Sequence, residues 1–158
     1  MTEQAEPAAE TGLAVQLEEI ETEPNPPRVG IIMGSKSDMD VMDGAASVLR
    51  DAGIAHEVKV MSAHREPATV AEYCSNARIR GLRVIIAGAG LSAALPGVAA
   101  AHTDLPVIGV PLSSRLSAMG GLDAILSVVQ MPPGVPVASV GLDNAKNAGH
   151  LALRILRA

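Results

Sequence analysis

Short apolar runs and longer helical stretches alternate regularly from Arg28 to the end of the chain, and this alternation constrains the fold more than any other feature. In the first helical stretch, residues 38–52, five apolar residues recur at spacings of three and four and share one helix face: Val41, Met42, Ala45, Ala46 and Leu49. Because each helix returns the chain to the same edge before the next strand begins, the strands are predicted to be parallel, with helices on both faces. We expect an α/β fold with a three-layer, doubly wound, flavodoxin-like parallel sheet. The predicted strands are 28–33, 57–61, 84–87, 107–110 and 137–140.

The predicted helices carry recognisable end signals. Asp38 stands where the N-cap of the first helix belongs, and Gly53 follows its last turn. Pro67 suits the first turn of the second helix, and Gly81 is its predicted end. The last helix is predicted over 144–156.

Charge is distributed unevenly along the chain, whose formal net charge is -5. Residues 1–27 contain seven Glu, four Pro and no Lys or Arg. Such a segment buries too little apolar surface to offset the entropy of ordering, so we expect a mostly disordered leader. A transient amphipathic helix over 11–21 remains an alternative. Residues 28–158 hold twelve basic and ten acidic side chains and are expected to form a single globular domain.

Composition excludes several classes of protein. Cys74 is the only cysteine, which rules out disulfides and all-cysteine metal clusters within one chain. Tyr73 is the only aromatic residue, so the stacking platforms used by single-strand nucleic-acid binders are missing. The sequence also lacks an apolar run of membrane-spanning length and the pattern of a signal peptide. We therefore expect a cytoplasmic protein without nucleic-acid or membrane partners.

Ligands of doubly wound sheets bind beyond the carboxyl ends of the strands, which makes the residues after each strand the candidate site. The first strand is followed by 34–38, Gly-Ser-Lys-Ser-Asp, which leads directly into a helix. The hydroxyls of Ser35 and Ser37 and the N-terminal N–H groups of the helix suit a phosphate. Asp38 is better suited to accept hydrogen bonds from ribose hydroxyls. A turn with a helix cap explains the segment equally well, and the GxxxxGK[ST] spacing is absent.

The second strand leads into 62–67, Ser-Ala-His-Arg-Glu-Pro. His64 can gain or lose a proton near neutral pH, and Arg65 is a permanent two-pronged ligand for anions. A single histidine is more often structural, but its place at a strand end beside an arginine favours proton transfer next to a bound anion.

The third strand ends in a glycine-rich segment in which Gly88, Gly90 and Ala93 match the GxGxxA dinucleotide fingerprint. The match is on the wrong strand and lacks an acidic residue about 20 positions further on. We interpret the segment as a wall where backbone amides meet a small planar or carboxylate-bearing substrate. Close packing of strand on helix is the alternative.

A long loop, residues 112–121, follows the fourth strand and is long enough to act as a lid over the site. Three polar residues of this loop are candidates for contacts with the ligand: Ser113, Ser114 and Arg115.

The remaining histidines and sulfur-containing residues are interpreted as background. Three histidines lack a partner at metal-ligand spacing, so we predict no metal site: His56, His102 and His150. Cys74 is expected to be a packing residue. Five methionines are expected to fill the core or the wall of the site: Met33, Met42, Met61, Met119 and Met131.

Four of these segments, taken in order, resemble the N5-carboxyaminoimidazole ribonucleotide mutase family of purine biosynthesis, over about 28–157. The segments that carry the resemblance are Gly34-Ser35-Lys36-Ser37-Asp38, Ser62-Ala63-His64-Arg65, Leu95-Pro96-Gly97 and Val129-Gln130-Met131-Pro132 with Gly134-Val135-Pro136-Val137. Each is short, but four at the expected strand ends form a specific pattern. Arg65 and the Gln-Met-Pro segment favour the mutase over the related direct carboxylase of animals, which typically has Lys after this histidine.

The resemblance implies an isomerase without a cofactor, which releases the carbamate carboxylate of its substrate as enclosed CO₂ and transfers it to a ring carbon. His64 is implied as the general acid and base. The implied substrate ligands are Ser35, Asp38 and Arg65, with Ser37 and Ser62 supporting the phosphate and Gly88, Ala89 and Leu95 completing the site. Members of the family are typically octamers with sites at subunit junctions, so we expect a homo-oligomer.

The chain departs from many bacterial mutases at three places. Ala94 stands where they have a histidine, the loop after Pro111 is about two residues longer, and the sequence ends without a further C-terminal helix. Two other functions stay open: the enzyme that forms a pyridinium-dicarboxylate nucleotide for the nickel pincer cofactor, which uses a cysteine, and a non-catalytic nucleotide-binding module. A pure binder has no need for a proton carrier such as His64.

Overall fold

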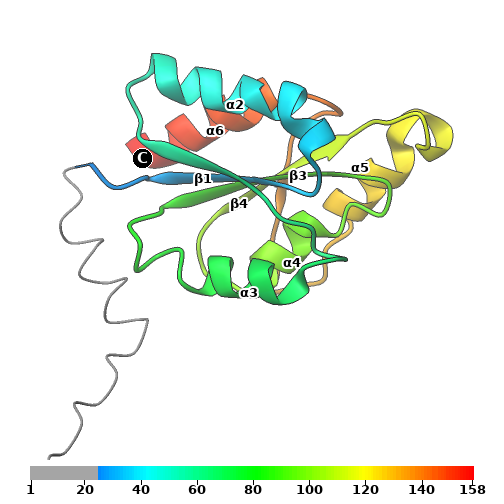
Figure 1. Ribbon diagram of the computed structural model, residues 1–158, viewed down its shortest axis with the longest axis horizontal. Coiled ribbons are helices and arrows are strands. Elements are labelled where there is room, and N and C mark those ends of the chain that lie inside the picture. Colours follow the sequence, from blue (N-terminus) through cyan, green and yellow to red (C-terminus); the bar gives the residue numbers. More distant parts are fainter. Residues whose placement is uncertain (1–24) are drawn as a thin grey trace, which may run out of the picture.

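A computed structural model of the chain describes residues 25–158, so the predicted leader lies outside the described residues except for its last three. Five parallel strands form one sheet in the order β2-β1-β3-β4-β5 (Figure 1). Their bounds are β1 Val29–Met33, β2 His56–Val60, β3 Val84–Gly90, β4 Val107–Leu112 and β5 Ala138–Ser139. The doubly wound, flavodoxin-like sheet predicted from the alternation is confirmed.

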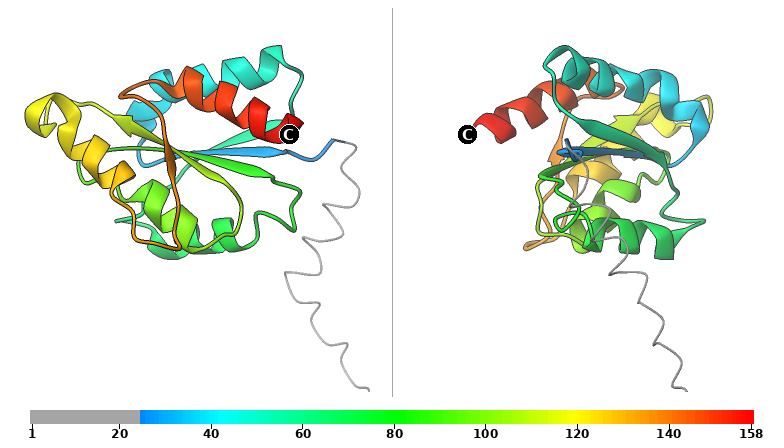
Figure 2. Two further views of the ribbon diagram at one scale, coloured as in Figure 1. Left: turned by 180° about the vertical axis from the view of Figure 1, so that it is seen from behind. Right: turned by 60° about the vertical axis from the view of Figure 1, so that its left-hand side comes forward.

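Helices cover both faces of this sheet, which gives three layers (Figures 1 and 2). On one face lie α2 Met39–Asp51 and α6 Ala145–Arg157. The other face carries α3 Pro67–Ser75, α4 Leu95–Ala101 and α5 Leu122–Val129. Two 3-10 turns, η1 Lys36–Asp38 and η2 Ala118–Gly121, precede α2 and α5.

The central strands separate two hydrophobic cores. All five residues of β1 are buried, and successive side chains point to opposite faces. Ile31 packs in the core beneath α2 and α6, whereas Ile32 packs in the core beneath the other three helices. Burial on both faces explains why these strands are continuous apolar runs rather than alternating ones.

Several predicted element ends were wrong; β3 and β4, for example, run to Gly90 and Leu112, past their predicted ends at 87 and 110. The second helix ends at Ser75 rather than near Gly81, because a series of turns carries the buried Ala77 and Leu82 into the core before the next strand. The last strand has two residues in place of four, since only Ala138 and Ser139 pair with β4 at this edge of the sheet. Gly53 does follow the first helix, in the left-handed region at φ +69°.

Asp38 occupies the N-cap position of α2, but its side chain makes no cap hydrogen bond. The hydroxyl of Ser35 performs that task one turn earlier, where it accepts a hydrogen bond from the Ser37 N–H at 3.3 Å. The Asp38 carboxylate therefore remains available to the site.

The structure confirms most of the predictions for the sulfur-containing residues. Cys74 is fully buried, as expected for a packing residue. Met33, Met42 and Met61 are buried, but the prediction for Met119 was wrong, since that side chain is 84% exposed. Within residues 25–158, no helix has the length and apolar character needed to cross a bilayer.

Candidate active site

The loops after β1, β2, β3 and β4 surround one cavity of about 420 Å³. The cavity lies beyond the end of β1, between its two neighbours in the sheet, β2 and β3. The strand order reverses at this point, because β2 pairs with one edge of β1 and β3 with the other. Eight of the nine residues predicted for the site line this cavity: Ser35, Ser37, Asp38, Ser62, His64, Arg65, Ala89 and Leu95.

The loop after β1 supplies hydroxyls and a carboxylate. Ser37 donates its hydroxyl proton to the Ser35 oxygen at 2.9 Å, so the two side chains lie together at the mouth of the cavity. Partial burial raises the pKa of Asp38 above its ordinary value, although hydrogen bonds from Ser35 and Ser37 and the charge of Arg65 act in the opposite direction. Burial therefore places an unfavourable charge in the site, and a partner that donates hydrogen bonds relieves it.

The loop after β2 forms a compact turn that presents His64 and Arg65. Ser62 is buried, its hydroxyl accepts a hydrogen bond from the Arg65 N–H at 3.2 Å, and its own N–H donates to the Glu66 carboxylate at 3.3 Å. Arg65 also donates one guanidinium N–H to the Gly34 carbonyl at 2.8 Å, which joins this loop to the one after β1. The remaining guanidinium donors and the exposed His64 ring are free to meet a ligand.

The loop after β3 forms the opposite wall. β3 continues three residues past its predicted end, and this extension brings Ala89 and Gly90 to the cavity, followed by Leu91 and Ser92. Gly88 is the one predicted ligand that does not line the cavity. A side chain there would overlap the Met42 sulfur, which a Cβ would approach to 2.4 Å, so close packing explains this glycine.

The loop after β4 closes the site through Ser113 and Ser114, two of the three polar residues expected in a lid. Arg115 does not line the cavity. Ala94 does line it, so the position where many relatives have a histidine faces the ligand here as a methyl group. Sequence reasoning missed Ser92, whose only signal was its place just beyond a strand that proved longer than predicted.

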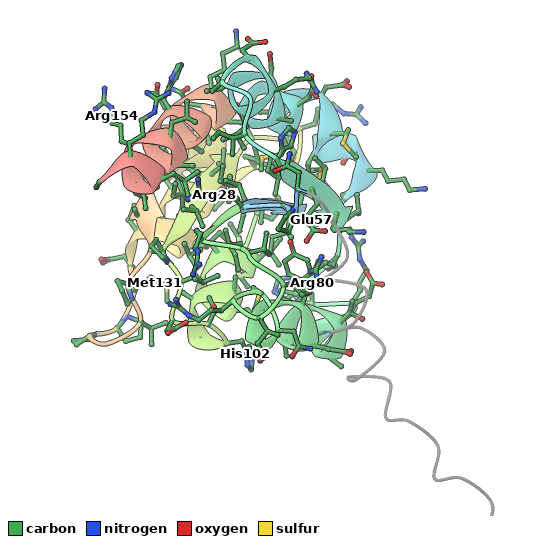
Figure 3. The ribbon with its side chains drawn as sticks, turned by 90° about the vertical axis from the view of Figure 1, so that its left-hand side faces the viewer. Arg28, Glu57, Arg80, His102, Met131 and Arg154 are labelled. Carbon is green, nitrogen blue, oxygen red and sulfur yellow. The ribbon has the colours of Figure 1, made fainter. Side chains whose placement is uncertain are left out.

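A second cavity, of about 700 Å³, lies between β2, α3 and residues 25–27, away from the four loops. Two of its charged groups, Glu57 and Arg80, pair with each other. Arg80 donates to both oxygens of Glu57 at 2.8 and 2.7 Å, and Tyr73 donates to Glu57 at 2.8 Å; Figure 3 shows Glu57 and Arg80 on neighbouring elements at this side. Burial and the Glu57 carboxylate raise the pKa of Tyr73, which keeps the phenol neutral. We assign this cluster to structure rather than to chemistry.

Neither thiol nor metal chemistry has a centre in the described part of the chain. Burial raises the pKa of Cys74 to about 11, so its nucleophilic thiolate is scarce, and the residue does not line the cavity. Among residues 25–158, no three His, Cys, Asp or Glu side chains are grouped as a metal would require.

Comparison with known proteins identifies the family of the chain that forms this cavity. The AIR carboxylase family model matches residues 28–158. The chain belongs to the AIR carboxylase family. Within that family it is 61% identical over 130 residues to the N5-carboxyaminoimidazole ribonucleotide mutase of Pyrococcus abyssi, covering 82% of this chain and 74% of the relative.

Two further proteins are similar to this chain. The chloroplastic phosphoribosylaminoimidazole carboxylase of Vigna aconitifolia is 55% identical over 128 residues, which cover 81% of this chain but only 23% of the plant protein. The crystal structure of PurE from Treponema denticola superposes with a TM-score of 0.72 at 34% identity, covering 83% of this chain and 80% of that one. The family resemblance and the fold inferred from the sequence are both confirmed.

Proposed function

We propose that this member of the AIR carboxylase family is an N5-carboxyaminoimidazole ribonucleotide mutase, an isomerase of purine biosynthesis. The observation that carries the proposal is the meeting of His64 and Arg65 with the Ser35–Asp38 loop in one cavity. The 61% identity to an archaeal protein of that name supports the same assignment. The cavity volume of about 420 Å³ lies in the range of small-molecule sites.

The proposed reaction moves one carboxyl group within the substrate. The bond between the exocyclic nitrogen and the carboxylate carbon breaks, the nitrogen gains a proton, and CO₂ is released inside the site. The ring carbon then forms a bond to CO₂ and loses its own proton, so protons, atoms and electrons balance. One group that first donates and then accepts a proton suffices, and His64 takes this role. Enclosure keeps the CO₂ from bulk water.

Substrate recognition follows from the same four loops. Arg65 and the hydroxyls of Ser35 and Ser37 bind anionic oxygens of the nucleotide, while Ser62 supports them from the buried side of the turn. Asp38 accepts hydrogen bonds from ribose hydroxyls, which relieves its unfavourable burial. Ala89 and Leu95 form the wall against the planar ring.

The assembly and location of the enzyme are further parts of the proposal. We propose a homo-oligomer in the cytoplasm, in accordance with the expectation from the family motifs. Apolar side chains that remain exposed on α5, Leu122, Leu126 and Val129, support an association of subunits. Residues 28–158 form the catalytic domain of this proposal.

The test supplies the purified full-length chain with the N5-carboxy substrate, without ATP or added metal, and follows formation of the 4-carboxy product. We expect conversion by the wild type, loss of conversion in His64→Asn with substrate binding retained, and normal conversion in His102→Asn. His102 is a matched control, since it is exposed at the end of α4 and does not line the cavity.

A parallel assay offers the uncarboxylated ribonucleotide with bicarbonate. Efficient carboxylation in that assay, with no isomerisation in the first, contradicts the mutase proposal and makes the protein a direct carboxylase. Equal loss of binding and turnover in His64→Asn contradicts the proton-transfer role, because it makes His64 a ligand.

A further inference from the structure

The loop that carries Ser113 and Ser114 is held by residues that follow the last strand, about 30 positions later in the sequence. The Asp143 carboxylate accepts two hydrogen bonds from Ser113, one from its N–H at 2.8 Å and one from its hydroxyl. The Asp143 N–H in turn donates to the Pro111 carbonyl at 2.9 Å. Three hydrogen bonds therefore join Asp143 to the end of β4.

Asp143 adopts an unusual backbone conformation to make these contacts. Its φ is +57°, in the left-handed region that residues other than glycine rarely occupy. Aspartate and asparagine tolerate this region better than other side chains. The two hydrogen bonds from Ser113 offset the energetic cost of this φ at Asp143. Such a strained residue that is held by its neighbours is typical of a position with a functional role.

The residue next to it holds the other end of the same loop. Gly121, at φ +108°, packs directly against Leu142, because a Cβ at that glycine would come within 2.8 Å of the leucine side chain. Leu142 and Asp143 thus contact the two ends of 113–121, and the loop between them has its own bonds, such as Ser114 N–H to the Ser117 hydroxyl at 2.8 Å.

We propose that Asp143 is a positioning residue, which holds Ser113 and Ser114 against the nucleotide cavity without touching the substrate. The inference rests on the proposed function, since these serines form the fourth wall of the cavity assigned to the substrate. Asp143 itself does not line that cavity. Its effect on the reaction passes through the position of the loop.

Two substitutions separate the side chain from the backbone. Asp143→Gly removes the carboxylate while keeping the left-handed φ favourable, and Asp143→Asn keeps that φ and one acceptor oxygen for the Ser113 N–H. We expect kcat/KM of Asp143→Gly to fall about tenfold or more, mainly through KM, because two hydrogen bonds to a charged group are lost. Asp143→Asn recovers most of this loss.

Asp104→Gly is the matched control. Asp104 is also exposed and accepts a hydrogen bond, from Arg78 at 2.9 Å, but it does not line the cavity. We expect wild-type kinetics for this variant. Amide hydrogen exchange of 113–118 in the same proteins is expected to be faster in Asp143→Gly alone, with the Tm of all variants within a few degrees of wild type.

Unchanged kinetics and unchanged exchange in Asp143→Gly overturn the inference while wild-type turnover keeps the proposed function intact. A large drop in Tm with unchanged kcat/KM per folded enzyme also overturns it, because the role is then structural only. If the wild type itself does not turn over, the proposed function fails, and faster exchange confined to 113–118 still tests the positioning contact.

Discussion

On one face of the sheet, α2 and α6 approach so closely that adding a single methyl group between them should push them apart. Gly149 of α6 faces α2, and a Cβ built there would lie 2.9 Å from the Val48 Cβ and 3.0 Å from the Ala45 carbonyl oxygen. The first contact is shorter than real Cβ atoms make, and the second is tighter than most of them. The atoms that obstruct the new Cβ belong to the backbone or to a stiff side chain. Gly149→Ala therefore forces the helices apart.

The magnitude follows from two opposing effects. Overpacking of this kind costs about 1–3 kcal/mol, whereas replacing a helical glycine by alanine gains about 1 kcal/mol in helix propensity. We expect Gly149→Ala to lower the free energy of unfolding by about 1 kcal/mol net, which corresponds to a Tm lower by about 2–4 °C.

Gly44 of α2 provides the matched control. Its Cβ would meet the Lys146 Cγ at 3.1 Å, and that flexible side chain can move aside. Gly44→Ala should therefore raise the free energy of unfolding by about 0.5–1 kcal/mol. The measurement is urea unfolding followed by circular dichroism at one protein concentration, since association shifts apparent stability. If both variants are stabilised equally, the close approach of α2 and α6 is refuted.

Three more outcomes are expected. Because burial raises the pKa of Cys74 to about 11, its iodoacetamide alkylation in the native protein should be about 10²-fold slower than in the unfolded chain, and equal rates would contradict its burial. Burial raises the pKa of Asp38, so the folded state binds this proton more tightly and the contribution of Asp38 to stability falls as pH rises above 3.8. Asp38→Asn should gain stability relative to wild type over that rise, and a pH-independent difference in urea unfolding would refute this. A chain that begins at Asn25 keeps all the cavity residues named above and should retain wild-type kcat/KM; a loss of more than about tenfold would assign the leader a part in catalysis.

Much of the site was predictable because parallel sheets impose a common geometry. Once the strands were identified, the residues after each one had to meet at a single edge, which brings His64 and Ser35 together across 29 positions of sequence. The motif 62–67 needed no packing information, since its turn is closed by local bonds such as that from the Arg65 N–H to Ser62.

Pattern alone was insufficient where contacts distant in sequence decide the outcome. A ligand role for Gly88 stays a prediction, but the structure favours the packing alternative, because Gly88 does not line the cavity and a Cβ there would approach the Met42 sulfur to 2.4 Å. Met119 looked like a core residue, but its φ of +49° belongs to a loop whose course depends on contacts with other elements. Periodicity also could not locate the end of α3, because burial of Ala77 and Leu82 depends on the sheet beneath them.

The sequence by itself determined the alternation of strands and helices, the family motifs and the chemistry available at the strand ends, because these depend on local pattern and residue type. The tertiary structure decided which residues share a wall of the cavity and which hold that wall in place. The contact between Asp143 and Ser113 illustrates the difference. Ser113 was a candidate for the lid, but Asp143 does not stand out in its own segment. Their contact exists only because the end of β4 and the turn before α6 lie side by side.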